Sequence, residues 1–166
     1  MKIGLLSDTH GYVDARIFQH FKDCDEIWHA GDFGNMQVVK ALQDFKPLRG
    51  VYGNIDGQDI RKEFPELEVF TCAGLQVMMT HIGGYPGRYA PGISQKIRSL
   101  HPGLFISGHS HILKVMYDKQ VGCLHMNPGA AGKQGWHKVR TLLRFSIEDA
   151  EVKHLELIEL GAKGNP

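Results

Sequence analysis

The stretch Met1-Lys-Ile-Gly-Leu-Leu-Ser-Asp-Thr-His10 decides how the rest of this chain is interpreted. Apart from Lys2, its first six residues are apolar or glycine, which predicts a short strand buried on both faces. Asp8 and His10 follow it two residues apart, and residues at that spacing in extended chain point the same way. A carboxylate oxygen and an imidazole nitrogen that face one point form the beginning of a metal site.

Composition limits the class of protein. The 166 residues fit a single domain spanning 1–166, and the formal net charge of +1 gives no electrostatic footprint for a membrane surface or for long nucleic acids. Ten histidines are a first indication of metal chemistry. The three widely spaced cysteines form neither a zinc pattern nor a disulfide framework, which favours a reducing, cytoplasmic location. No stretch has the length and hydropathy of a membrane span.

The order of apolar segments predicts an α/β fold. The chain opens with a β-α-β-α-β pattern, which predicts parallel strands with right-handed crossovers. The later segments read mostly as antiparallel hairpins. Two mixed sheets packed face to face, with helices on the outside, satisfy this order. The predicted strands are 1–6, 26–30, 47–52, 69–72, 75–80, 104–107, 112–117, 121–126, 141–147 and 152–158, and the predicted helices are 13–21, 36–42 and 94–100.

Chemistry-bearing side chains follow several of these strands. Asp8, Asp32 and Asn54 come after the first three, so the carboxyl ends of a parallel sheet would place their oxygens on one edge. His81 follows a later strand, and His109 and His111 follow another. With His10, the set exceeds what one mononuclear site usually takes from protein. Two metals fit the count better, and Asp32 is the natural bridge because its two oxygens sit on a short stem.

Taken in order, these motifs resemble the calcineurin-like metallophosphoesterase signature. Asp8-Thr-His10, Gly31-Asp32, Gly53-Asn54, His81 and Gly108-His-Ser-His111 carry the resemblance, and Asn127-Pro-Gly129 is similar to a segment of the small bacterial and archaeal phosphodiesterases. The resemblance implies a four-layer αββα sandwich with two divalent cations. It assigns Asp8, His10 and His111 to one ion, Asn54, His81 and His109 to the other, and Asp32 to both. It favours Mn²⁺, although the donor set also suits Fe, Zn²⁺ or Ni²⁺.

The same resemblance implies the activity of a metal-dependent phosphodiesterase. A hydroxide that bridges the metals would attack the phosphorus of a small phosphoester, and Asn54 would contact the phosphate as well as a metal. Many members of the family follow the asparagine with a proton-donating histidine, but this chain has Ile55. The loss of a general acid predicts a preference for good leaving groups. Asp56 is the weak remaining candidate for a proton donor.

Other interpretations stay open at this stage. Asp8 alone could be a helix cap, and His10 or His81 alone an ordinary surface or core histidine. A protein-interaction scaffold similar to the retromer subunit of this family is the alternative function, and a phosphomonoesterase or nuclease is a third. His29 is as consistent with supporting the site by hydrogen bonding as with core packing, and His125 has about even odds of lying near the site. The sequence leaves the physiological substrate and the oligomeric state undetermined.

Overall fold

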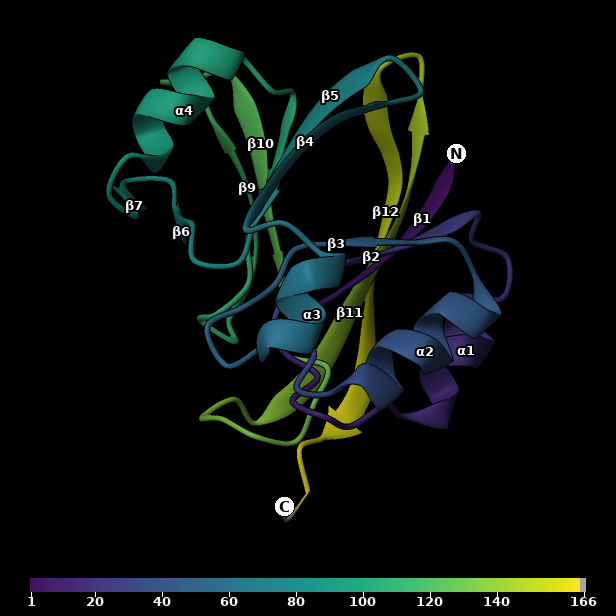
Figure 1. Ribbon diagram of the computed structural model, residues 1–166. Coiled ribbons are helices and arrows are strands. Elements are labelled where there is room, and N and C mark those ends of the chain that lie inside the picture. The colour runs from purple at the N-terminus through teal and green to yellow at the C-terminus, as the bar shows by residue number, and fades with distance from the viewer. Residues whose placement is uncertain (165–166) are drawn as a thin grey trace.

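The computed structural model describes residues 1–164 as two five-stranded sheets with four helices (Figure 1). In spatial order, the first sheet contains β12 (Glu151–Ala162), β11 (Val139–Glu148), β1 (Lys2–Leu6), β2 (Glu26–His29) and β3 (Leu48–Gly50). The second contains β4 (Leu67–Cys72), β5 (Leu75–Thr80), β8 (Leu104–Ile106), β10 (Cys123–Pro128) and β9 (Leu113–Asp118). A small hairpin joins β6 (Gly84–Tyr85) to β7 (Arg88–Tyr89).

Both sheets are mixed. In the first, β1, β2 and β3 run parallel, and the long β11–β12 hairpin is added antiparallel to β1. In the second, β8 lies between β5 and β10 and is parallel to both, whereas β4 and β9 are antiparallel edge strands. The prediction of two mixed sheets is therefore confirmed. The expectation that the second half is mostly antiparallel missed the parallel pairing of β8, which short apolar strands do not reveal from sequence.

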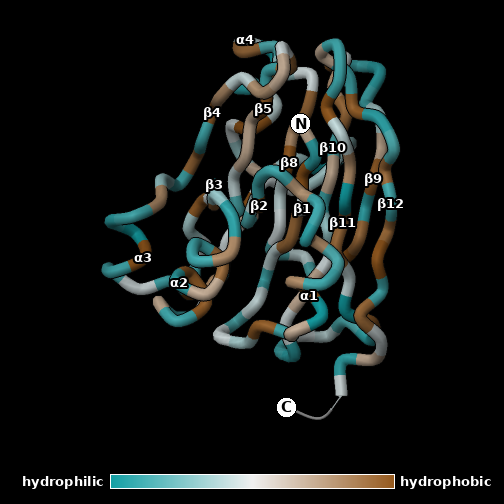
Figure 2. Tube along the Cα trace, turned by 90° about the vertical axis from the view of Figure 1, so that its right-hand side faces the viewer, coloured by the Kyte–Doolittle hydropathy of each residue, from teal (hydrophilic) through white to brown (hydrophobic). Residues whose placement is uncertain are grey.

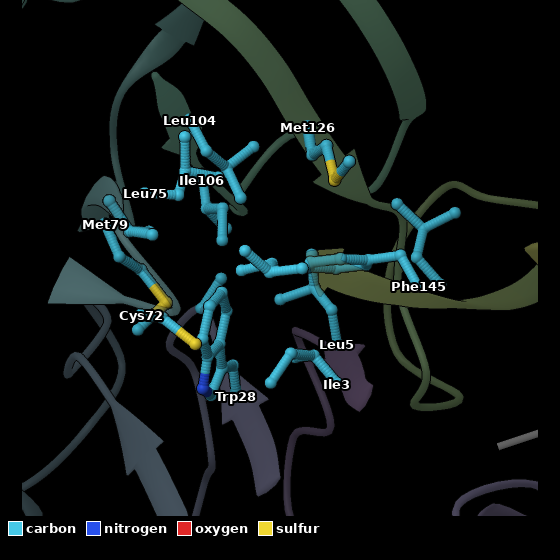
Figure 3. Packing of buried hydrophobic residues seen from close by; sticks show 14 of the residues in the cluster. Ile3, Leu5, Trp28, Cys72, Leu75, Met79, Leu104, Ile106, Met126 and Phe145 are labelled. Carbon is cyan, nitrogen blue, oxygen red and sulfur yellow. The ribbon is translucent and has the colours of Figure 1, made fainter. Parts of the chain in front are cut away.

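The main core lies between the two sheets, where Trp28 and Phe145 of the first sheet meet Met79, Ile106 and other apolar side chains of the second (Figure 3). Successive side chains of β1 point to opposite faces of the sheet, and both faces are covered, so the strand is buried on both sides. Ile3 and Leu5 enter this central core, whereas Leu6 joins a second core under the helices. A side chain at Gly4 would place its Cβ 2.6 Å from the ring of Phe21, so only glycine allows the helix that precedes Phe21 to pack this closely.

Helices cover the outer face of each sheet. Helices α1 (Ala15–His20), α2 (Met36–Phe45) and α3 (Gln58–Glu63) pack on the first sheet, and α4 (Ile93–Leu100) packs on the second. Hydrophobic and hydrophilic residues alternate along these elements, as one buried and one exposed face require (Figure 2). The predicted four-layer arrangement is confirmed. Within residues 1–164, no helix has the length and apolar character needed to cross a membrane.

The structure adds elements that the sequence did not predict. Helix α3 has six residues and the β6–β7 hairpin has two per strand, so neither offers enough periodicity to detect. The predicted hairpins at residues 112–126 and 141–158 are confirmed with bounds shifted by a few residues. Helix α1 is short but begins with a clear signal, since the carboxylate of Asp14 accepts a hydrogen bond from the backbone N–H of Arg16.

Candidate metal centre

Two groups of potential metal ligands lie side by side at one end of the sheets. Asp8, His10 and His111 form the first cluster, and in each group the ligand atoms lie within 4.8 Å of one another. Asp32, His81 and His109 form the second cluster. All six belong to the set predicted from sequence. The fold thus brings together residues as far apart in the chain as Asp8 and His111.

Strand ends produce this convergence. Asp8 follows β1, Asp32 follows β2 and Asn54 follows β3, at the carboxyl ends of three parallel strands. His81 directly follows β5, and His109 follows its parallel neighbour β8. Backbone hydrogen bonds tie these loops to one another. The N–H of Asp8 donates to the carbonyl of Gly31, and the N–H of Gly108 donates to the carbonyl of His81.

In the first cluster, two imidazoles and a carboxylate face a common point. The Nε2 atoms of His10 and His111 lie 3.2 Å apart. Oδ1 of Asp8 lies 3.0 Å from Nε2 of His111 and 3.8 Å from Nε2 of His10. A neutral imidazole binds a metal ion through the lone pair of a ring nitrogen. Two imidazole nitrogens and a carboxylate oxygen that face one point therefore have the geometry of a metal-binding group.

In the second cluster, His81 is oriented by the backbone. Its Nδ1 lies 2.7 Å from the carbonyl oxygen of Ala30, which can only accept, so Nδ1 carries the proton and Nε2 presents a lone pair to the site. Nε2 of His81 lies 3.1 Å from Oδ1 of Asn54, which places the predicted asparagine beside this cluster. The rings of His81 and His109 meet edge to face with centroids 5.3 Å apart.

Asp8 supplies the observation that tests whether cations fit. Its Oδ2 accepts hydrogen bonds from the Ser7 hydroxyl (2.6 Å) and the His109 backbone N–H (3.1 Å). Its Oδ1 is buried and has no hydrogen-bond partner within residues 1–164, although three imidazole Nε2 atoms lie within 3.9 Å. A buried carboxylate oxygen without a donor is costly unless a cation meets it. The residues present therefore fit a bound metal.

The charges of the site reinforce one another. Burial acts to raise the pKa of Asp8, but the surrounding imidazoles of His10, His111 and His81 outweigh it and hold the pKa well below its usual range. Burial acts to lower the pKa of His81, but the carboxylates of Asp32 and Asp8 outweigh it and raise that pKa. The two carboxylates are thus ionised and create a strongly negative point that attracts cations.

The backbone is strained at the same positions. Asp8, His10, Asp32, His109 and His111 all have positive φ values, between 47° and 67°. Residues other than glycine rarely adopt this left-handed region, and each such residue costs about 1–3 kcal/mol. These five are half of the ten non-glycine residues with positive φ among residues 1–164, and strain at polar side chains is typical of a functional site whose side chains must point in fixed directions.

Neighbouring residues hold the loops in place. His29 is fully buried, its Nδ1 accepts from the N–H of Gly31, and its Nε2 lies 3.0 Å from the Thr9 hydroxyl. Burial lowers the pKa of His29 to about 3, so the ring is a neutral support. Asn127 donates to the carbonyl of Gly108 and to the Ser110 hydroxyl. Of the two roles left open for His29, the structure shows the hydrogen-bonded support, and Asn127 braces the loop that carries His109 and His111.

Asp56 does not have the surroundings of a proton donor, which corrects our expectation. Its side chain is buried, and its two oxygens accept hydrogen bonds from the backbone N–H groups of Phe33, Gly34 and Gly53. A carboxylate that accepts three N–H bonds serves as an anchor for the loops carrying Asp32 and Asn54. No side-chain pattern indicates this role, because the three donors are main-chain groups.

Some residues near the site were not anticipated. The hydroxyl of Ser7 contacts Asp8, and a serine adjacent to a candidate ligand is the signal that could have indicated it. His137, which lacked ligand context in the sequence, is half-buried with its ring 5.2 Å from that of His111, and its Nε2 lies 2.9 Å from the carbonyl of Gly132. Arg88 is exposed on β7.

Three exposed isoleucines are sequence neighbours of candidate metal ligands. Ile55, Ile82 and Ile112 directly follow Asn54, His81 and His111 in the chain. Their side chains are 47%, 48% and 63% exposed. Three of the ligand loops therefore carry exposed apolar surface next to a polar side chain, and we call these three residues the isoleucine collar.

Comparisons with known proteins agree with this geometry. Residues 1–150 match the calcineurin-like phosphoesterase superfamily domain. A probable metallophosphoesterase of Methanothermobacter thermautotrophicus is 31% identical over 120 residues, which cover 67% of each chain. A phosphodiesterase of Methanocaldococcus jannaschii is 27% identical over 148 residues, covering 78% of this chain and 83% of the relative.

Solved structures show the same fold. An archaeal phosphodiesterase superposes with a TM-score of 0.76 at 24% identity and covers 96% of this chain and 100% of its own. Vps29 of Entamoeba histolytica, in a structure complexed with Zn²⁺, superposes with a TM-score of 0.73 at 17% identity and covers 96% of this chain and 99% of its own. With a family match over most of its length, this chain belongs to the calcineurin-like phosphoesterase superfamily.

Proposed function

We propose that this protein is a dinuclear-metal phosphodiesterase that hydrolyses small phosphodiesters. The observation that carries the proposal is the position of Asp32. Its Oδ2 lies 3.2 Å from Nε2 of His81 in the second cluster and 3.7 Å from Nε2 of His10 in the first. One carboxylate that faces both clusters is the arrangement that two neighbouring cations require.

The chain's residues divide the work as follows. Asp8, His10 and His111 would hold one cation, Asn54, His81 and His109 the other, and Asp32 both. Two bound divalent cations would supply an activated water at neutral pH and offset the negative charge on the phosphoryl oxygens. Asn54 is exposed beside the second cluster, where its amide N–H would donate to a phosphate oxygen. The mixed oxygen and nitrogen donors suit Mn²⁺, our proposed metal, as well as Fe, Zn²⁺ or Ni²⁺.

The surroundings of Asn54 favour substrates with good leaving groups. Ile55 occupies the position directly after it, and an aliphatic side chain donates no proton. Asp56 is held as a hydrogen-bond acceptor by three backbone N–H groups. An alcohol that leaves without protonation must be stable as an anion, so aryl and other activated diesters suit this site.

A non-catalytic interaction scaffold is the alternative. It is favoured by the fold shared with Vps29 and by the exposed isoleucine collar. The two complete clusters favour the enzyme, since a scaffold has no need for left-handed backbone at five candidate ligands. Turnover separates the two functions.

The test is hydrolysis of bis(4-nitrophenyl) phosphate by protein stripped of metal and resupplied with Mn²⁺. We expect turnover that depends on added metal and is lost together with metal binding in Asp32→Ala. The matched control is Asp44→Ala, which removes an exposed carboxylate from helix α2. Metal binding without turnover of any diester would favour the scaffold, and full turnover by Asp32→Ala in metal-free buffer would contradict the proposed site.

A further inference from the structure

A cavity lies between the second cluster and helix α3, with a volume of about 210 Å³. Asn54 and His81, two candidate ligands of the same cation, form part of its wall. Tyr52 and Arg61 also line it. A diester whose phosphate meets Asn54 would therefore have this cavity beside one of its two ester arms.

The cavity has room for a ring with a small substituent. Its volume exceeds the roughly 150 Å³ in which a protein interior holds benzene. Ile82, a member of the isoleucine collar, contributes an aliphatic wall that is 48% exposed. Tyr52 is half-buried and contributes an aromatic ring. Apolar surface for a ring thus lies next to polar groups that can contact a substituent.

Arg61 gives the cavity a positive charge that is held in place by several contacts. Its Nε donates to the carbonyl of Asp56 at 2.7 Å, and its Nη2 lies 3.4 Å from the carbonyl of Asn54. The central carbon of the guanidinium lies 4.6 Å from the centre of the Tyr52 ring, in a cation–π contact. A guanidinium that is already fixed loses little freedom when it binds a ligand.

The charge of Arg61 is not neutralised by a carboxylate of residues 1–164. Several other arginines in this range form ion pairs with Asp or Glu, but Arg61 does not. The carboxylate of Asp56 is occupied by three backbone N–H groups. Nη1 of Arg61 is accessible to solvent and has no hydrogen-bond partner in the described part of the chain. Free N–H groups on a half-buried guanidinium suit a carboxylate or a phosphate.

We propose that this cavity is a subsite for one ester arm of the substrate, and that Arg61 binds a second anionic group, a carboxylate or a phosphate, on that arm. The proposal rests on the proposed phosphodiesterase function and names its substrate class, which is small phosphodiesters with an additional negative charge. Among the lining residues, Glu66 carries the one carboxylate. It is exposed, so water screens its repulsion of an anionic arm.

Binding tests the subsite independently of turnover. The full chain, loaded with Zn²⁺, is titrated in a calorimeter with 3-carboxybenzylphosphonate and with its neutral carboxymethyl ester, neither of which has a phosphoester bond. We expect the carboxylate compound to bind about tenfold more tightly, the effect of hydrogen bonds from a charged group. Arg61→Gln should remove this preference, and Arg61→Lys, which keeps the charge, should retain part of it.

A third compound distinguishes the two kinds of anion. 3-Phosphonobenzylphosphonate carries a phosphonate where the first compound has its carboxylate. The anion for which the site is built should lose more affinity in Arg61→Gln than the other one does. No loss for either anion would overturn the proposal.

The control variant is Lys62→Gln, which removes the same charge from the next residue of α3 and leaves the lining of the cavity unchanged. It should preserve the preference for the carboxylate compound. Arg61 also supports the loop that carries Asn54, so the ratio of the two affinities is the quantity that reports on the subsite. Equal affinities in the native chain, or an equal loss for both compounds in Arg61→Gln, would overturn the proposal.

A second variant keeps the test available if Arg61→Gln does not fold. Ile82→Asp places a negative charge on the exposed wall of the cavity. It should weaken binding of the carboxylate compound more than binding of the ester, because like charges repel. Equal weakening of both compounds would contradict an anionic arm in this cavity.

Turnover supplies the second readout. We compare 4-nitrophenyl 3-carboxyphenyl phosphate with its carboxymethyl ester, because both release 4-nitrophenolate. We expect kcat/KM to favour the carboxylate substrate by about tenfold, and the preference to shrink as salt is added. Equal turnover of the two diesters, with equal binding of the two phosphonates, would overturn the subsite and leave the phosphodiesterase intact. Tighter binding of the carboxylate compound with no turnover of any diester would support the subsite and contradict the proposed function.

Discussion

Oδ2 of Asp32 lies 3.2 Å from Nε2 of His81, and the other oxygen of the same carboxylate accepts a hydrogen bond of 3.1 Å from the backbone N–H of Ile55. One oxygen is thus anchored by the loop after β3, and the other faces both ligand clusters. Because the anchor belongs to a neighbouring loop, the position of Asp32 depends on residues that do not contact any substrate. This dependence gives a test of how tightly the site must be held.

Gly53 controls that position. A Cβ at this residue would lie 1.9 Å from Oδ1 of Asp32 and 2.4 Å from its backbone nitrogen, so Gly53→Ala must displace the carboxylate. Misplacing a reacting group by about 1 Å costs on the order of 100-fold in rate. We expect Gly53→Ala to lower kcat for bis(4-nitrophenyl) phosphate by at least that factor in folded protein. Gly57→Ala, whose new Cβ would come no closer than 3.1 Å to another atom, is the control and should keep most of the activity.

Asp56→Asn separates an anchor from a proton donor. Replacing one oxygen with an amide leaves at least one buried N–H of Phe33, Gly34 or Gly53 without its acceptor, which costs about 1–3 kcal/mol of the free energy of unfolding. We expect the midpoint of urea unfolding to fall, whereas Asp59→Asn on exposed helix α3 leaves it unchanged. The dependence of rate on the pKa of the leaving group should keep its slope. If the rate of Asp56→Asn depended more steeply on the pKa of the leaving group than the rate of the native chain does, Asp56 would be a proton donor after all.

Ile55→His tests the missing general acid. Ile55 is 47% exposed beside Asn54, so an imidazole fits without disturbing the core. General acid catalysis contributes about 10²–10⁴-fold where the donor is aligned. We expect the native chain to lose rate steeply as the pKa of the leaving alcohol rises from nitrophenol to alkyl alcohols. Ile55→His should flatten this dependence by accelerating the alkyl esters, and a native chain with a flat dependence would show that a donor already exists.

Asp14 predicts a pH dependence of stability. Its carboxylate accepts hydrogen bonds from the guanidinium of Arg16 and, at 2.8 Å, from that of buried Arg140, which joins the start of α1 to β11. The hydrogen bond from Arg16, helped by Arg140, holds the pKa of Asp14 well below its usual value of 3.8. We expect Asp14→Ala to lower the free energy of unfolding at pH 7 by roughly 2 kcal/mol, through the lost cap and the unpaired Arg140.

The sign of the pH effect follows from the lowered pKa. The folded state favours the ionised carboxylate, so its contribution is complete above the usual pKa of 3.8 and is lost as the pH falls below it. The difference in unfolding free energy between native chain and Asp14→Ala should therefore be constant from pH 7 to about 5 and shrink in more acidic urea titrations. Asp149→Ala, which removes a carboxylate that is 91% exposed, should show no such difference.

The sequence was sufficient for the parallel strands of the first sheet because its signals are local. A buried apolar strand followed by a polar turn predicts β1, β2 and β3, and their parallel order places Asp8, Asp32 and Asn54 together. The parallel pairing of β8 could not be predicted from the sequence, because it depends on which strands become the neighbours of β8 in the folded core. Helix α3 was also missed, because six residues hold less than two turns of amphipathic pattern.

The residues of the site were predicted more completely than their surroundings. Charged and imidazole side chains at successive strand ends are visible in the sequence, and the structure places six of them in the two clusters with Asn54 beside them. The anchoring of Asp56 and the proton placement on His81 depend on backbone groups from distant loops, and no side-chain pattern records those. The strain at Asp8 and His111 likewise appears only in backbone angles.

The number of metal ions bound per chain tests the central claim most directly. Protein dialysed against Mn²⁺ and analysed for metal content should hold two ions, and His111→Ala and His81→Ala should each hold about one, because each variant removes a ligand from a different cluster. A single ion in the native chain, or two ions retained in both variants, would contradict a dinuclear centre built from these seven side chains.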